Sequence, residues 1–160
     1  MRIAIVSEEG IVTNIIESPN TYADNQKLCY DWTQLRESYT DVEPLEHAKA
    51  RYIVAAKAYR DEQEVAAITY NGNDYDYDDK ARERLRVARQ MLTDKIGATP
   101  INWTTADNTD VTLTIDDFAA INILAATRSN TLHIAYRTTK EKLETATTIE
   151  ELEQIYPLKG

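Results

Sequence analysis

The residues whose spacing comes closest to metal chemistry are the alternating carboxylates Asp74, Asp76 and Asp78. Carboxylate oxygens at every second position are typical of a calcium loop. Counted from Asp74, however, that loop requires Gly at its sixth position and Glu at its twelfth, where this chain has Asp79 and Leu85. The preferred interpretation is therefore structural: the aspartates are solvated and cap the following helix, while the tyrosines between them pack inward.

The other candidate catalytic residues do not form a recognisable constellation. His47 and His133 are the only histidines, and neither has the i, i+4 partner that a helical metal site would supply. We expect His133 at an interface or half-buried position. Phosphate-binding loops, Cys-x-x-Cys pairs and the Gly-x-Ser-x-Gly elbow do not occur. These observations predict a protein that is not an enzyme and takes no cofactor and no metal.

Cys29 is the only cysteine, so the chain cannot form an internal disulfide or build a thiolate metal cage by itself. Buried cysteines are usually inert. We predict that Cys29 is a buried, unreactive thiol.

One long helix, over residues 115–146, is the element around which the other segments are arranged. Thr114 and Asp117 form a shortened capping box at its start, and no Gly or Pro follows until Pro157. Its length would be about 45 Å, which exceeds the needs of a small core, so it either spans a domain or meets a partner. Arg128 and Ser129 interrupt its apolar stripe, which argues against an uninterrupted coiled coil. The stripe consists of Phe118, Ile121, Ala125, Leu132, Tyr136, Leu143 and Ala146.

Three β hairpins are predicted. Residues 2–7 and 11–17 form the first, with Gly10 in its turn, and its two apolar faces require cover from elsewhere. The second joins residues 68–70 to 73–77 through Asn71-Gly72, a strong signal for a type I′ turn. The third pairs residues 101–104 with 111–113.

Three further helices and one irregular segment complete the predicted organisation. Helices are expected over residues 44–66, over 79–96 with Asp78 as cap and Gly97 as terminator, and over 149–155. Residues 21–40 read as an ordered, irregular linker. Its aromatic side chains either pack over the first hairpin or face a partner.

Composition limits the classes of partner. The 160 residues carry a net charge of −9, with 42% hydrophobic and 28% charged residues, so a folded protein is expected. The acidic charge argues against a broad nucleic-acid or anionic-membrane surface and favours neutral or basic proteins. No 18-residue apolar run and no signal peptide are recognised, which predicts synthesis in the cytosol.

The order of these elements resembles a domain-of-unknown-function family of small tailed-bacteriophage proteins, over about residues 46–153. The motif that carries the resemblance is Trp103 followed by Asp107 and Asn108, then a Val-Thr-Leu-Thr strand. Leu132, His133 and a Thr-Ile-Glu-Glu-Leu close add to it. The first hairpin also resembles the one that opens many tail-fibre-associated phage proteins. The resemblance implies association with tail-fibre genes.

These observations predict an α+β protein with an N-terminal β hairpin and linker (1–43), then a mainly helical domain with a long C-terminal helix and two hairpins (44–160). The expected function is a bacteriophage tail structural protein in the virion. It would bind tail-fibre or baseplate protein and form a homo-oligomer, with three copies as the natural guess. The alternative is a tail-fibre assembly chaperone in the host cytoplasm. The predicted partner-binding residues are Ile5, Val12, Ile16, Tyr30, Trp32, Leu132, His133 and Tyr136.

Overall fold

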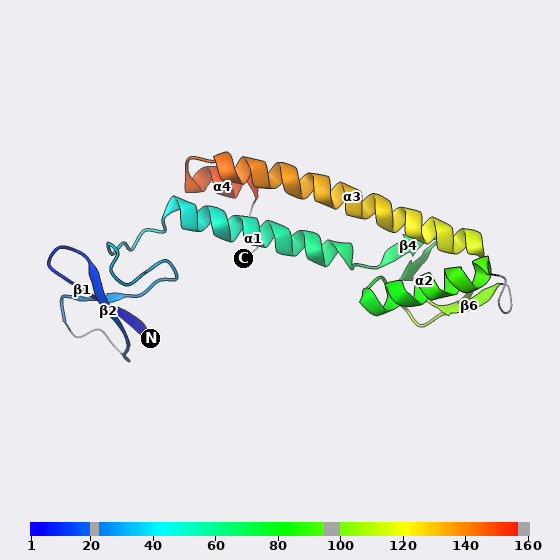
Figure 1. Ribbon diagram of the computed structural model, residues 1–160, viewed down its shortest axis with the longest axis horizontal. Coiled ribbons are helices and arrows are strands. Elements are labelled where there is room, and N and C mark those ends of the chain that lie inside the picture. Colours follow the sequence, from blue (N-terminus) through cyan, green and yellow to red (C-terminus); the bar gives the residue numbers. More distant parts are fainter. Residues whose placement is uncertain (20–22, 95–99, 157–160) are drawn as a thin grey trace. The chain divides into compact units, whose positions relative to one another are not determined.

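The computed structural model describes residues 1–19, 23–94 and 100–156, and it confirms an α+β fold with short antiparallel hairpins and one long helix (Figure 1). In chain order the elements are β1 (Arg2–Val6), β2 (Val12–Glu17), β3 (Gln26–Leu28), α1 (Leu45–Glu64), β4 (Ile68–Tyr70), β5 (Asn73–Tyr75), α2 (Asp79–Thr93), β6 (Ile101–Thr104), β7 (Asp110–Leu113), α3 (Ile115–Thr145) and α4 (Ile149–Ile155).

The chain divides into two compact units. Unit 1 comprises Met1–Tyr52 together with the segment from Thr145 onward, and unit 2 comprises Ile53–Glu144. Helix α1 contributes to both. The domain boundary predicted between residues 43 and 44 stays a prediction.

The sheet of unit 1 confirms the first predicted hairpin. Strand β1 pairs antiparallel with β2, and Gly10 in the turn has a φ of 79°, which a residue without Cβ adopts without strain. Ala4, Val6 and Val12 form its buried cluster, against which Ile15 and Tyr39 pack. One apolar face of the hairpin is therefore covered within the unit.

The segment predicted as an irregular linker contains a third strand, so that part of the prediction is wrong. Strand β3 pairs antiparallel with β1 and gives the sheet the order β2-β1-β3. Its three residues, Gln-Lys-Leu, show no apolar alternation. The position of β3 is therefore determined by its hydrogen bonding to β1, whose residues are distant from β3 in the sequence.

The two hairpins of unit 2 follow the predicted turn chemistry. Asn71 and Gly72 have φ values of 48° and 79°, the pair of positive angles that a type I′ turn requires. Strands β6 and β7 pair Ile101 with Leu113 and Trp103 with Val111. The hairpins are joined where the Ala106 N–H donates to the Asp74 carbonyl over 2.8 Å.

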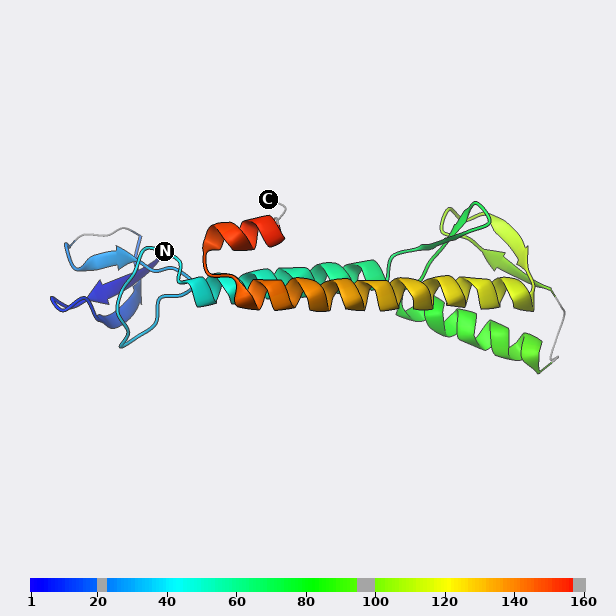
Figure 2. The same cartoon turned by 90° about the horizontal axis from the view of Figure 1, so that it is seen from above.

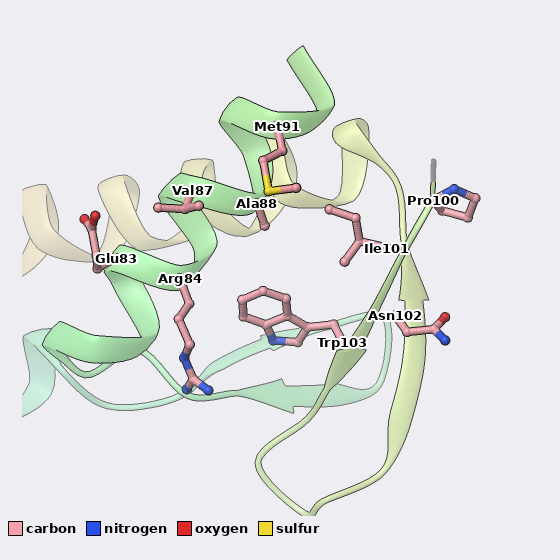
Figure 3. Close-up of a pocket in the computed structure, with 9 residues that line it drawn as sticks. All are labelled: Glu83, Arg84, Val87, Ala88, Met91, Pro100, Ile101, Asn102 and Trp103. Atoms are coloured by element: carbon pink, nitrogen blue, oxygen red, sulfur yellow. The ribbon is translucent and has the colours of Figure 1, made fainter. Parts of the chain in front are cut away.

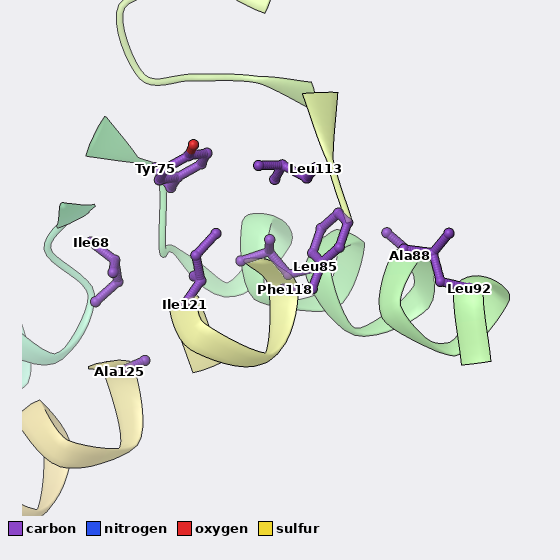
Figure 4. Close-up of a cluster of buried hydrophobic side chains, with 9 residues drawn as sticks. All are labelled: Ile68, Tyr75, Leu85, Ala88, Leu92, Leu113, Phe118, Ile121 and Ala125. Atoms are coloured by element: carbon purple, nitrogen blue, oxygen red, sulfur yellow. The ribbon is translucent and has the colours of Figure 1, made fainter. Parts of the chain in front are cut away.

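The core of unit 2 lies where both hairpins meet α2 and α3 (Figure 4). Phe118 is completely buried near its centre, and its ring meets the Trp103 ring edge-on at a centroid distance of 5.4 Å. The buried members are Ile68, Tyr75, Leu85, Ala88, Leu92, Leu113, Phe118, Ile121 and Ala125.

Helix α3 begins at the predicted capping box. The Thr114 N–H and hydroxyl donate to the Asp117 carboxylate over 2.8 and 2.6 Å, and the Asp117 N–H donates back to the Thr114 hydroxyl over 3.3 Å. The stripe is buried at Phe118, Ile121, Ala125 and Leu143, as predicted, and Ala146 is buried just beyond the helix. No helix in the described residues is long and apolar enough to cross a membrane.

Helix α2 begins at the predicted cap. The Asp78 carboxylate caps its start by accepting from the Ala81 N–H over 2.7 Å, as the sequence indicates. The described helix runs to Thr93 with Asp94 as C-cap, and residues 95 and 96, to which the prediction extended it, lie outside the described residues. The predicted terminator Gly97 lies outside the described residues.

Replacing Phe118 by Ala is expected to lower the free energy of unfolding by about 3–5 kcal/mol, because a fully buried aromatic ring is lost and a cavity remains. Urea unfolding followed by circular dichroism measures this change. Val54→Ala, at a side chain 67% exposed, is the control and should shift stability by less than about 0.5 kcal/mol. A Phe118 variant as stable as the control would contradict the described core.

Asp117 should make stability depend on acid pH. Hydrogen bonds from the Thr114 hydroxyl and N–H and from Tyr70 lower the pKa of this carboxyl below its usual value. Its stabilising contribution is therefore complete above about pH 4, the ordinary range of an Asp, and is lost as pH falls through the lowered pKa.

The measurement is the free energy of unfolding from pH 7 to pH 2 in two variants. Asp117→Asn should be less stable at neutral pH by about 1 kcal/mol, the usual size of a capping interaction, and should fall less on acidification. Asp116→Asn, at an exposed neighbour in the same turn, is the control. Identical curves for the two variants would exclude the assigned role.

Candidate functional site

A groove between α2 and β6 is the candidate interaction site of unit 2 (Figure 3). Its volume is about 650 Å³. The side chains of Val87 and Met91 on α2 and of Ile101 and Trp103 on β6 line it from two sides, with Ala88 at its base. The lining is therefore mainly apolar and aromatic.

The two elements present these side chains for local reasons. On α2, Ala81, Leu85, Ala88 and Leu92 are the buried stripe, and Val87 and Met91 lie beside it, 42% and 40% exposed. On β6, burial alternates, so that Ile101 and Trp103 are half-buried and point toward α2 while Asn102 points away.

Trp103 is the largest side chain of the groove. Its position is fixed by contacts with Phe118 and β7. Its ring meets Phe118 edge-on, and its backbone pairs with Val111. The Arg84 guanidinium lies 5.9 Å from the indole centroid, within the range of a cation–π contact. A partner that enters the groove thus meets a preorganised indole, an arrangement that lowers the entropy cost of binding.

The charges beside the groove are mostly basic. Helix α2 carries five basic residues against two acidic ones, although the whole chain is acidic. Glu83 is paired with Arg86, whose Nε and Nη2 donate over 2.9 and 2.7 Å, and these hydrogen bonds lower the pKa of Glu83. Arg84 is the basic side chain at the groove itself. The shape of the groove and the basic charge beside it together suit a binding segment that presents an apolar side chain flanked by acidic residues.

A second cluster lies where α3 meets the end of α1 in unit 2, and the side-by-side helices are visible in Figures 1 and 2. Arg128 donates from Nη1 to the carbonyls of Ala66 and Ala67 over 2.7 and 3.0 Å, and from Nη2 to the Glu64 carbonyl over 2.7 Å. One guanidinium thus satisfies three carbonyls at and just beyond the end of α1, where no further turn of helix supplies N–H donors.

The surroundings of Arg128 explain why its charge is tolerated. Burial lowers the pKa of the guanidinium, against the opposing effects of Tyr77 and Glu64. The Tyr77 ring lies 5.4 Å from the guanidinium carbon. The Glu64 carboxylate also accepts from the Ser129 hydroxyl over 2.9 Å and lies 2.9 Å from His133 Nε2.

The predicted partner-binding residues of α3 fall into this second cluster. His133 is exposed and pairs with Glu64, whereas Leu132 and Tyr136 are half-buried. The Arg60 guanidinium lies 4.8 Å from the Tyr136 ring centroid. His133 and Tyr136 therefore contribute to the junction of α3 with α1, and the binding of all three side chains to a partner stays a prediction.

The predicted partner-binding residues of unit 1 divide into two groups. Val12 is completely buried in the sheet cluster and offers no accessible surface, while Ile5 and Ile16 are half-buried on β1 and β2. Tyr30 and Trp32 are stacked, with centroids 4.8 Å apart and planes 2° apart.

The aromatic pair is held beside the start of α1. Trp32 Nε1 donates to the Thr40 carbonyl over 3.1 Å, and its ring meets His47 edge-on at 5.4 Å. His47 in turn lies 2.7 Å from a Glu43 carboxylate oxygen. The hydrogen bond from Arg51 is the main cause that lowers the pKa of Glu43, so this carboxylate stays charged and holds the group together.

The Asp-rich hairpin has the structural roles that the sequence favours. The Tyr75 side chain is buried and Tyr77 half-buried, whereas Asp74, Asp76 and Asp78 are exposed. Asp78 caps α2, and no group of three or more metal-binding side chains occurs within residues 1–19, 23–94 and 100–156. Cys29 is half-buried, so the prediction of a fully buried thiol is wrong.

Sequence reasoning missed the groove residues Arg84, Val87 and Met91, and it interpreted Arg128 only as an interruption of a stripe. The available signal was the position of Val87 and Met91, two exposed apolar residues four apart beside the stripe of α2.

A comparison with protein families identifies the family of this chain. Residues 47–156, which contain both the groove and the Arg128 cluster, match a domain of unknown function, DUF4376. The chain belongs to the DUF4376 family. The match confirms that the region predicted over about residues 46–153 belongs to a domain-of-unknown-function family, while its association with phages and tail-fibre genes stays a prediction. No curated protein and no solved structure matches the chain.

Replacing Arg128 by Met keeps an unbranched stem of similar shape but removes the guanidinium and all its donors. The three carbonyls at the end of α1 then lose their partner, and we expect the free energy of unfolding to fall by about 1.5–3 kcal/mol. Arg128→Lys should lose part of that amount, because an ammonium lacks the planar fork. Arg137→Met on the exposed side of α3 is the control, and equal stability of Arg128→Met and this control would contradict the capping role.

Proposed function

We propose that this chain is a structural component of a bacteriophage tail that binds a tail-fibre or baseplate protein in the virion and acts by binding, not by catalysis. The groove between α2 and β6 carries the proposal, because apolar and aromatic side chains surround a fixed indole there. The resemblance to small tailed-phage proteins, over nearly the same residues as the DUF4376 match, supports the phage setting.

The groove suits recognition of an amphipathic segment. Trp, Met and Arg are enriched at the energetic centres of protein interfaces, and Trp103, Met91 and Arg84 lie together here. The partner would insert an apolar side chain against Trp103 and place acidic residues toward Arg84 and its basic neighbours on α2. Several copies of the chain in each particle would present several such grooves to the fibre or baseplate.

Quantitative mass spectrometry of purified particles of the phage that encodes this chain tests the proposal. A fixed ratio of the chain to fibre and baseplate proteins would support a structural tail component and give its copy number. Absence from particles, together with a complex between the chain and fibre protein in the lysate, would overturn it in favour of a fibre-assembly chaperone. Absence from the particles and from any complex with fibre protein would overturn both the structural and the chaperone role.

The groove itself is tested by Val87→Glu, which places a carboxylate on an exposed helical position and should leave the core intact. Incorporation into particles should fall at least tenfold, since the charge is desolvated against Trp103 when the partner docks. Val54→Glu, at the 67% exposed position of α1, is the matched control. Equal incorporation of the two variants would place the contact elsewhere on the chain.

A further inference from the structure

Strand β6 has one edge that is hydrogen-bonded to β7 and a second edge that no strand of the described residues covers. The two strands form a sheet of their own. The Thr105 N–H donates to the Thr109 carbonyl over 2.9 Å and continues the ladder between them. Because bonded and unbonded residues alternate along an antiparallel pair, the odd-numbered residues of β6 bond to β7, whereas Asn102 and Thr104 point their N–H and carbonyl groups at the other edge.

A second hydrogen bond supports this direction. The N–H of Ala106, which lies on the same edge as Asn102, donates to the Asp74 carbonyl of β5 over 2.8 Å. The edge is therefore used at the hairpin turn and open beside β6. Within the residues that the structure describes, neither main-chain group of Asn102 has a hydrogen-bond partner on this edge.

The open edge of β6 borders the groove between α2 and β6. Asn102 lines this groove, although its side chain points away from it (Figure 3). Its main chain therefore faces the groove, between Ile101 and Trp103, whose side chains point toward α2. The groove thus combines an apolar wall with a main-chain donor and a main-chain acceptor.

This combination favours an extended occupant over a helical one. The Asn102 N–H and carbonyl are spaced so that one residue of a neighbouring antiparallel strand can bond to both. A helix uses its own main-chain groups internally and leaves this pair without a partner. An extended segment bonds to the pair with its main chain, and its alternate side chains fill the apolar pockets beside it.

We propose that the groove binds an extended segment of its partner, which adds to the open edge of β6 as an antiparallel third strand. The inference rests on the groove of the proposed function and specifies the conformation of the segment that fills it. The antiparallel direction continues the existing sheet and is the more stable pairing. The residue opposite Asn102 exchanges two main-chain hydrogen bonds with it. Its two neighbours place apolar side chains beside Trp103 and Ile101, against Val87 and Met91.

Hydrogen exchange in the free chain, followed residue by residue by NMR, tests whether the edge is open. The Asn102 N–H should exchange at least tenfold faster than the Trp103 N–H, which belongs to the ladder with Val111. Equal protection of the two N–H groups would mean that this chain or a second copy of it already covers the edge, and would overturn the proposal.

The probe for strand addition is the uncharged peptide Thr-Leu-Thr-Leu-Thr, capped at both ends and titrated to about 2 mM. In the proposed register its middle Thr lies opposite Asn102, and its two Leu side chains lie beside Trp103 and Ile101. Saturable shifts of the Asn102 and Trp103 N–H signals are expected. A peptide methylated at the nitrogen of the middle Thr should bind at least tenfold more weakly. The absence of saturable shifts, or equal binding of both peptides, would overturn the proposal.

Two proline variants form a matched pair within the hairpin. Asn102→Pro removes the N–H at the groove, and Thr112→Pro removes the N–H of the residue paired with it, which points to the outer edge of β7. The first should weaken peptide binding at least tenfold and the second should leave it unchanged; equal effects would contradict strand addition. Circular dichroism shows whether each variant has folded, and the methylated peptide decides the question if Asn102→Pro has not.

Particle incorporation separates this inference from the proposed function. If Val87→Glu lowers incorporation but both peptides bind equally, the groove holds its partner by side chains alone and strand addition is wrong. If the peptides differ as expected but Val87→Glu is incorporated normally, strand addition stands and the proposed role of the groove in the particle is wrong.

Discussion

The end of helix α1 depends on a single side chain from α3. Arg128 donates to the carbonyls of Glu64, Ala66 and Ala67, so the chain leaves the helix in one direction only. The next residue, Ile68, then enters the core one turn of α3 away, beside Ala125. The position of β4 follows from the direction in which the chain leaves α1. The β4–β5 hairpin, its hydrogen bond to the β6–β7 turn and the placement of Trp103 therefore depend on the capping of α1.

Local chemistry made much of the fold predictable. The turn at Asn71-Gly72 needs two positive φ angles, and the caps at Asp78 and Thr114 bond to N–H groups three residues away, so each signal lies within four residues of its effect. Strand β3 and the role of Arg128 were not predictable, because the partners lie 21 or more residues away along the chain. A three-residue strand has no pattern of its own to reveal such a contact.

The candidate site was predictable only in its parts. The burial of Ala88 and Leu92 follows from helical spacing, and the half-burial of Trp103 follows from alternation in β6. The groove exists because the packing of these elements leaves Val87 and Met91 uncovered next to the indole. Likewise, the stacking of Trp32 on Tyr30 and its contact with His47 depend on where the linker meets α1, which no local signal specifies.

Arg128 also explains why α3 departs from an ordinary amphipathic helix. In the sequence it interrupts the buried stripe, which argued against a coiled-coil seam on that face. In the structure it is the one charged residue between Phe118 and Tyr136, and it is used internally. The helix therefore uses its only central charge to cap α1, and Ile123 and Ile134 lie on an exposed face whose other central residues, Thr127 and Asn130, are uncharged. The side chain that caps α1 is thus also the reason why the middle of the longest helix carries no charge on its outer face.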